Sequence, residues 1–355
     1  MSKKTVANIL SDLELRNEVP KNWRETIATE ATRLSLAGPW HTRLLIGFGA
    51  WLSSFLFIGF LSALGMTVGG FGIYGVVLLG ASLAVSKFKR GTFWDQAVLA
   101  FSLSGQAFVI TSITNDIHSN DVFKIMSIFV VVFNLIWPFL LRTRTQAFIS
   151  MLFFAGGVVE IFYAFDIRFL VPVAPAALFF AAAYTVTAEP KYFGNPLAEI
   201  LPAMASGLLF GGFGAVSISS YYIFEAFAAK GNEIYPHPWL TSILVILSIY
   251  YFCVRSDDVL FRTRGAFAYA ALFLIGVASF KAPGILFALG VAVVGAIYLE
   301  SSWLWLGLLF GAVFTTLFLY GTDLSLLTKS YFLLGLGALL FGIRKMLPVK
   351  KAASL

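Results

Sequence analysis

Long apolar runs separated by short polar segments dominate the pattern along the chain. Most runs hold roughly the 20 residues that a helix needs to cross about 30 Å of hydrocarbon. The pattern predicts an all-α fold, a polytopic transmembrane helix bundle of about twelve spans. The expected spans are 44–64, 66–85, 97–114, 125–141, 147–165, 169–187, 197–223, 239–254, 265–280, 285–299, 303–320 and 331–343.

The first 43 residues have a different pattern. Within residues 5–38, apolar positions recur at steps of three and four, which is typical of short amphipathic helices. Two such helices are too small to bury a core of their own, so we expect them to dock on the bundle, the membrane surface or a partner. The expected organisation is a cytoplasmic helical segment (1–43), a transmembrane bundle (44–343) and a basic cytoplasmic tail (344–355).

Basic residues are distributed unevenly over the predicted loops. If the N-terminus is cytoplasmic, only five of the 25 Lys and Arg residues face the other side: Lys124, Arg168, Lys230, Lys281 and Lys329. The excess on one side is the insertion signal of multi-pass membrane proteins and predicts that both termini are cytoplasmic. It also argues against a nucleic-acid partner for the net charge of +7, because the charges follow alternate loops rather than one surface.

Composition narrows the chemistry further. Hydrophobic residues make up 59% and charged residues 12% of the chain, well away from a soluble average near one half and one quarter. The single Cys253 excludes an intramolecular disulfide and a cysteine-based metal site, and the three His residues lie in separate polar segments. No phosphate-binding loop, nucleophile elbow or zinc-protease motif occurs. We therefore predict no metal, no cofactor and no catalytic residue.

Three polar residues inside predicted spans are the candidates for an intramembrane site: Glu160, Asn134 and Gln106. Each costs free energy in hydrocarbon unless it meets protein or water. Asn134 precedes Pro138 by four residues, and a proline has no N–H to return to that carbonyl. The alternatives are a hydrogen-bonded core without a ligand for Asn134 and Gln106, and a Glu160 that extends to the interface. Helix-breaking positions are expected at Pro138, Pro175 and Pro202.

Small and polar residues also suggest how the spans pack. A stripe on the fifth span is expected to face protein or water and to bring Glu160 close to Asn134; it comprises Gln146, Ser150, Phe153, Gly156, Gly157, Glu160 and Tyr163. The pairs Gly207/Gly211 and Gly307/Gly311 let helix backbones approach closely. We expect them to serve packing within the chain, with a dimer contact as the alternative.

The segment 38–61, GPWHTRLLIGFGAWLSSFLFIGFL, carries a resemblance to a known family. A Pro-Trp pair and an Arg lead into a Gly- and Trp-containing first span, here Pro39, Trp40, Arg43, Gly47, Gly49 and Trp51. This resembles the opening of a bacterial membrane-protein family, domain of unknown function 4401. The resemblance implies a multi-pass protein of the bacterial inner membrane, often encoded beside a single-span membrane protein with a GDYxxLxY motif. It supplies a membrane-protein partner but no catalytic residue.

Two functions follow as expectations. The first is a transporter-like bundle with an intramembrane polar site, because many spans, prolines and a few polar groups are the materials of such sites. The alternative is a non-catalytic scaffold or assembly partner of another membrane protein, and an enzyme acting on lipid comes third. The lipid bilayer is the one certain partner of either, and the oligomeric state stays open.

Overall fold

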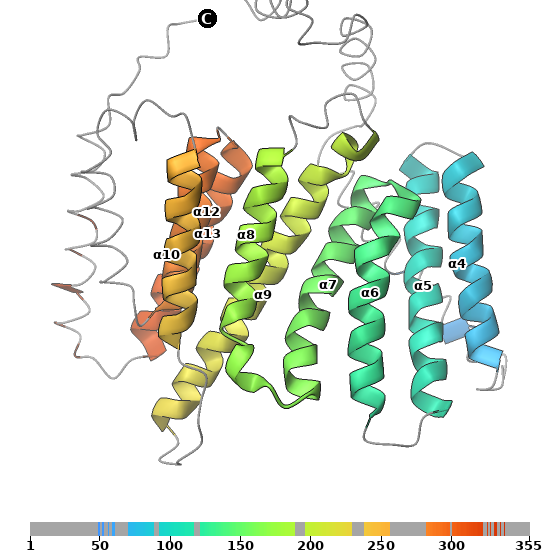
Figure 1. The fold of residues 1–355 in the computed structure, drawn as a ribbon, viewed down its shortest axis with the longest axis horizontal. Helices are drawn as coiled ribbons and strands as arrows, with labels where there is room; N and C mark the ends of the chain where they lie inside the picture. Colours follow the sequence, from blue (N-terminus) through green and yellow to red (C-terminus); the bar gives the residue numbers. More distant parts are fainter. Residues whose placement is uncertain are drawn as a thin grey trace, which may run out of the picture. The chain divides into compact units, whose positions relative to one another are not determined.

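A computed structural model describes residues 70–88, 92–116, 121–188, 196–228, 238–255, 282–298 and 300–321, with isolated positions between 49 and 60 and between 325 and 337. These residues are entirely helical and contain no strand. Nine α-helices are described (Figure 1): α4 (Phe71–Phe88), α5 (Thr92–Asp116), α6 (Val122–Leu141), α7 (Arg144–Ala164), α8 (Val173–Ala188), α9 (Leu201–Ala228), α10 (Pro238–Arg255), α12 (Pro283–Ile297) and α13 (Ser301–Gly321). Two 3-10 turns, η2 (Arg168–Leu170) and η4 (Pro196–Glu199), precede α8 and α9.

Five of these helices have the length and apolar composition of a membrane span: Trp94–Asn115, Val122–Leu141, Arg144–Ala164, Leu201–Ile218 and Ser301–Leu319. Four further apolar helices are shorter: Phe71–Lys87, Val173–Thr187, Trp239–Arg255 and Pro283–Ile297. The chain is therefore a multi-pass membrane protein, as the apolar runs indicated. The count of twelve spans is not supported, because the described residues form nine α-helices.

Each described helix coincides with one of the predicted spans, and the remaining predictions fall elsewhere. The predicted spans 265–280 and 331–343 lie wholly or mostly outside the described residues, as does 44–64 apart from isolated positions. The N-terminal segment 1–43 and the tail 344–355 also lie outside them.

The chain divides into two compact units, of which the first is Met1–Ala215. In this unit α4 packs along α5, and α6 packs along α7. The α4–α5 contact is a close backbone approach, since a Cβ on Gly75 would lie 2.9 Å from the Gly105 carbonyl oxygen. Val98, Trp137 and Leu141 form a buried cluster that joins α5 to α6 and receives Leu79, Leu83, Val85 and Phe133 from α4 and α6.

Two short connections make antiparallel neighbours. Only Arg142 and Thr143 separate α6 from α7, and Arg142 caps α6 in the left-handed region with φ 54° while its N–H donates to the Pro138 carbonyl. The expectation that the fourth and fifth predicted spans are antiparallel neighbours is confirmed (Figure 1). After α7, Asp166 also adopts a positive φ of 56°, and Arg168 forms an exposed ion pair with it at 3.2 Å.

The glycine pair Gly207/Gly211 packs α9 against α7. A Cβ on Gly207 would collide with the Phe148 carbonyl oxygen and lie 2.8 Å from Met151 Cβ. A Cβ on Gly211 would collide with the Ala155 methyl group. Close packing of this kind within the chain is what the sequence predicted for the pair, and it is confirmed.

The second unit, Val216–Leu355, is built around α12. This helix packs against both α10 and α13, and eleven of its fifteen residues are buried. Gly307 of α13 meets α12 backbone, since its Cβ would lie 2.7 Å from the Ala288 carbonyl oxygen. Gly311 faces the same helix, with 3.8 Å to Ala288 Cβ, so the second glycine pair also packs within the chain.

The prolines behave differently from the expectation that all three break helices. Pro175 and Pro202 lie in the first turns of α8 and α9. No intrahelical N–H donor is needed there, so proline starts these helices rather than breaking them. Pro138 lies inside α6, which continues to Leu141 without interruption. Its missing N–H leaves the Asn134 carbonyl without the usual helical donor.

Candidate intramembrane polar site

Seven polar side chains are buried on α5, α6 and α7, and we call five of them the polar layer: Ser102, Gln106, Asn134, Gln146 and Ser150. Their exposed fractions run from 0% to 5%. A polar side chain this deep in an apolar helix is stable only when its hydrogen-bonding groups are matched. The partners of each group therefore decide what the layer can do.

Ser102 joins α5 to α6. The indole N–H of Trp137 donates to Ser102 Oγ at 2.7 Å, and Gln106 Nε2 donates to the same oxygen at 3.2 Å. A buried tryptophan usually finds an acceptor for its N–H, and Ser102 supplies it from 35 residues away. The Trp137 bond crosses between the helices and fixes their register there, whereas the Gln106 bond lies within α5.

Asn134 lies at the same level as Gln106. Because the helices are antiparallel and Ser102 faces Trp137, a position three residues from Trp137 faces the neighbourhood of residue 105, within about 1.5 Å of rise from Gln106. Asn134 Nδ2 donates to the Val130 carbonyl at 2.9 Å, one turn earlier in its own helix. Its Oδ1 is buried and accepts no hydrogen bond from the described residues. The structure thus places Gln106 and Asn134, two of the three predicted residues, at the same level along the helix axes.

The polar layer extends to α7 through Gln146 and Ser150. Gln146 Nε2 donates to Ser150 Oγ at 2.9 Å, and both side chains are 0% exposed. Gln146 Oε1, like Asn134 Oδ1, is buried without a donor. Because Gly157 meets Val130 and Val131 across the α6–α7 contact, Gln146 lies about 11 Å from Asn134 along the helix axes, so the two oxygens do not form one site.

Glu160 lies apart from the polar layer. Gly157 meets Val130 and Val131 across the α6–α7 contact, so Asn134 and Glu160 lie on opposite sides of that level. The offset is about 10 Å at 1.5 Å rise per residue. The Glu160 carboxylate is half-buried and has no ion pair within the described part of the chain.

The predicted stripe on α7 is divided rather than uniform. Gln146, Ser150 and Gly157 are buried, whereas Phe153 is 37% exposed. Gly156 is exposed, and a Cβ there would have no neighbour within 4 Å. A helix has 3.6 residues per turn, so a stripe built from three- and four-residue steps drifts around the axis and includes positions on both edges.

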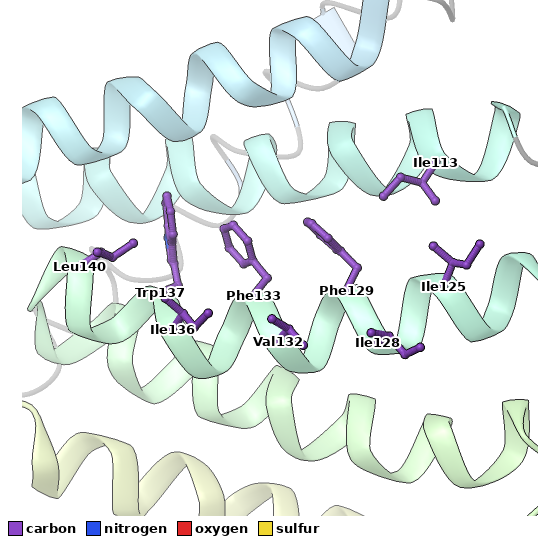
Figure 2. Close-up of a pocket in the computed structure, with 9 residues that line it drawn as sticks. All are labelled: Ile113, Ile125, Ile128, Phe129, Val132, Phe133, Ile136, Trp137 and Leu140. Atoms are coloured by element: carbon purple, nitrogen blue, oxygen red, sulfur yellow. The ribbon is translucent and has the colours of Figure 1, made fainter.

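An apolar groove runs along α6, between α6 and α5 (Figure 2). Its volume is about 480 Å³, and no polar side chain lines it. Phe129, Phe133 and Trp137 stand one turn apart and stack, with ring centroids separated by 5.3 Å and 4.5 Å. The remaining lining residues are Ile113, Ile125, Ile128, Val132, Ile136 and Leu140.

The kinds of oxygen atom in the polar layer limit the ligands that it can bind. Amide and hydroxyl oxygens are neutral, so they can accept hydrogen bonds or coordinate a hard cation, but they cannot act as strong bases. Within the ranges that the structure describes, no three His, Cys, Asp or Glu side chains gather into a metal-binding group.

Comparison with known proteins gives the family. The family model with the description Domain of unknown function (DUF4401) matches residues 39–349 of the chain. The chain belongs to this family. The resemblance carried by residues 38–61 is confirmed at this level, whereas bacterial origin and an adjacent membrane protein stay predictions. No curated protein and no solved structure matches the chain.

Sequence reasoning for this family member missed Ser102 and Trp137. Serine is common in apolar helices and carries no sign of its partner. Trp137 did carry a signal, because an indole N–H inside a predicted span needs an acceptor. That argument would have indicated a polar partner on a neighbouring helix without telling which one.

Proposed function

We propose that this protein is a transporter-like multi-pass protein whose polar layer binds a small cation or hydrogen-bond donor within the membrane. The observation that supports it most is the buried Asn134 Oδ1, which accepts no hydrogen bond from the described residues. Leaving a buried acceptor unmatched costs about 1–3 kcal/mol. A ligand that donates hydrogen bonds or positive charge removes that cost.

Pro138 adds a second acceptor at the same residue. The Asn134 carbonyl has no proline N–H to receive, so the backbone and the side chain of one residue both offer oxygen. Unwound or unpaired carbonyls beside polar side chains are a recurring way to coordinate cations at the membrane midplane. Glu160 is assigned to the approach of this site rather than to the site itself, because of its offset of about 10 Å along α7.

The proposal is tested by electrical recording from proteoliposomes on a solid-supported membrane after jumps in Na⁺, K⁺, ammonium or proton concentration. The wild-type protein should give a current with at least one of these cations. Asn134→Leu should abolish it, because both acceptors belong to this residue and the substitution removes the carboxamide. Leu135→Ala, on the exposed face of the same helix, should keep it.

Glu160→Gln serves as a second variant. It preserves shape and removes the charge at the approach, so it should lower the apparent cation affinity while leaving expression and the maximal current intact. Absence of current with all four cations would contradict transport of small cations. If another membrane protein co-purified in a stoichiometric amount and no current were seen, the alternative function as a scaffold would be favoured. No surface in the described part of the chain supports that function.

The proposal also includes a cellular location and an orientation in the membrane. We assign the protein to a bacterial cytoplasmic membrane with both termini cytoplasmic, since basic residues are concentrated on one side of the predicted loops. In the described residues Lys87, Arg142, Arg144 and Arg255 belong to that side, and Lys124 and Arg168 to the other. Residues 1–43 are proposed as a docking module and 344–355 as a basic tail.

A further inference from the structure

The apolar groove on α6 has exposed side chains on its rim and is not filled by the part of the chain that the structure describes. Ile128, Val132 and Ile136 on its rim are 44%, 50% and 51% exposed. Figure 2 shows Phe129, Phe133 and Trp137 rising from α6 toward α5, with Leu140 at one end and Ile113 and Ile125 at the other. From Ile125 to Leu140 the groove is about 22 Å long at 1.5 Å per residue.

These dimensions fit an acyl chain. One leaflet contributes about half of a hydrocarbon core near 30 Å, so a chain reaching the midplane needs about 15 Å of groove. The lining has no hydrogen-bonding group to offer to a polar ligand, apart from the Trp137 indole N–H, which is already donated to Ser102.

The two ends of the groove differ in charge. At the Ile125 end, Lys124 is paired with Asp121 at 2.8 Å and lies over the Phe165 ring, so its charge is balanced. At the Leu140 end, Arg142 is exposed, its Nε donates to the Phe139 carbonyl at 3.3 Å, and it has no ion pair within the described ranges.

Two further basic residues lie at the level of Arg142. Arg144 begins α7, two residues along the chain. Lys87 is in the last turn of α4, where Val85 packs against the cluster containing Trp137 and Leu141. Basic residues at the headgroup level next to an apolar slot between helices are the pattern by which membrane proteins hold anionic lipids.

We propose that the groove on α6 binds one anionic phospholipid, with an acyl chain along the aromatic ladder Phe129–Phe133–Trp137 and the phosphate at Arg142. The guanidinium suits this role, because its planar set of N–H donors matches phosphate oxygens. Trp137 lines this site and donates to Ser102 of the polar layer, but the lipid proposal does not depend on the transport proposal.

The test measures lipid retained by the full-length protein in native mass spectrometry, after exchange into detergent containing equal amounts of phosphatidylglycerol and phosphatidylcholine with the same acyl chains. The wild-type protein should retain one phosphatidylglycerol in preference to phosphatidylcholine. Ile136→Trp fills the groove and should reduce retention of both lipids several-fold. Leu135→Trp adds the same bulk on the same helix outside the groove and should leave retention unchanged.

The headgroup is tested separately. Arg142→Gln should reduce the preference for phosphatidylglycerol about fivefold, the effect of one basic residue near the surface, and leave phosphatidylcholine retention unchanged. Arg168→Gln changes an exposed arginine in η2, beyond the end of α7 that is remote from Leu140, and should have no effect. Equal retention by the Ile136→Trp and Leu135→Trp proteins, or no headgroup preference in the wild type, would overturn the proposal.

A photoreactive benzoylphenylalanine at Val132 identifies the occupant directly in membranes. A lipid adduct supports the proposal. An adduct with a second copy of the chain, or with another protein, overturns it, because either would show that a helix rather than a lipid covers the groove.

Discussion

Ser102 illustrates how much one small residue can decide in an apolar bundle. Its hydroxyl accepts from Trp137 and from Gln106, so a single oxygen matches two donors that come from different helices. Ser82 is equally buried, but it donates to the Leu79 carbonyl of its own helix, and no other residue depends on it for a partner. The two serines are chemically identical, but only Ser102 accepts hydrogen bonds from other buried side chains.

This contrast gives a prediction. Ser102→Ala strands two buried donors and should destabilise the protein by about 1–2 kcal/mol. Ser82→Ala strands none, because the Leu79 carbonyl keeps its helical partner, and should change stability by less than about 0.5 kcal/mol. Thermal unfolding of both variants in the same detergent measures the difference. Equal effects would mean that the Ser102 bridge contributes nothing.

Sequence could identify single residues better than pairs of residues. Gln106 and Asn134 were predictable, because an amide inside an apolar run must meet protein or water. Their common level was not, since it depends on the register that Ser102 and Trp137 set across 35 residues. Glu160 was predicted to join Asn134, but helical rise places it about 10 Å away in height.

At the scale of helices, small residues decide which pairs come close. The glycines of α9 that face α7 are in contact with backbone or with Ala155, whereas Gly214 of the same helix has open space around its Cα. Helices in a membrane gain no hydrophobic effect from association, so this close packing carries much of the interaction between them.

Gly207→Ala should therefore destabilise the protein by about 1–3 kcal/mol, since the added methyl group would collide with the Phe148 carbonyl. Gly214→Ala is the matched control. It should be neutral or stabilise by up to about 1 kcal/mol, because alanine favours the helix. Unfolding in mixed micelles, followed by circular dichroism, measures both. A Gly207→Ala protein as stable as the control would show that α7 and α9 are not held together at this contact.

The helices themselves were largely predictable from apolar runs, and their ends were less so. Polar turns at Arg142 and at Asp166 placed the α6–α7 and α7–α8 connections well. Pro175 and Pro202 were wrongly predicted to break helices, because the residue type alone does not tell whether a proline begins a helix or interrupts one. The predicted number of spans is not supported either, since several apolar helices, such as the 15-residue α12, are short for a bilayer.

At the scale of the whole molecule, charge rather than packing is expected to fix the orientation. A periplasm-active reporter fused after Leu355 should be silent, and one inserted near Lys230 should be active, because positively charged loops stay in the cytoplasm. A cytoplasm-active reporter at the same two positions is the control and should give the opposite pattern. Activity of the periplasmic reporter at Leu355 would contradict the assignment of both termini to the cytoplasm.

A cation can bind at Asn134 only if water reaches that residue, so its accessibility to thiol reagents tests the proposed site. Asn134→Cys and Leu135→Cys are made in a Cys253→Ala background, which removes the single native cysteine. Each protein is treated in proteoliposomes with a small hydrophilic thiol reagent and with a lipid-soluble one. Asn134→Cys should react with the hydrophilic reagent, whereas the exposed Leu135→Cys should react only from the lipid phase. An Asn134→Cys protein that is folded but inert to the hydrophilic reagent would contradict the proposed site.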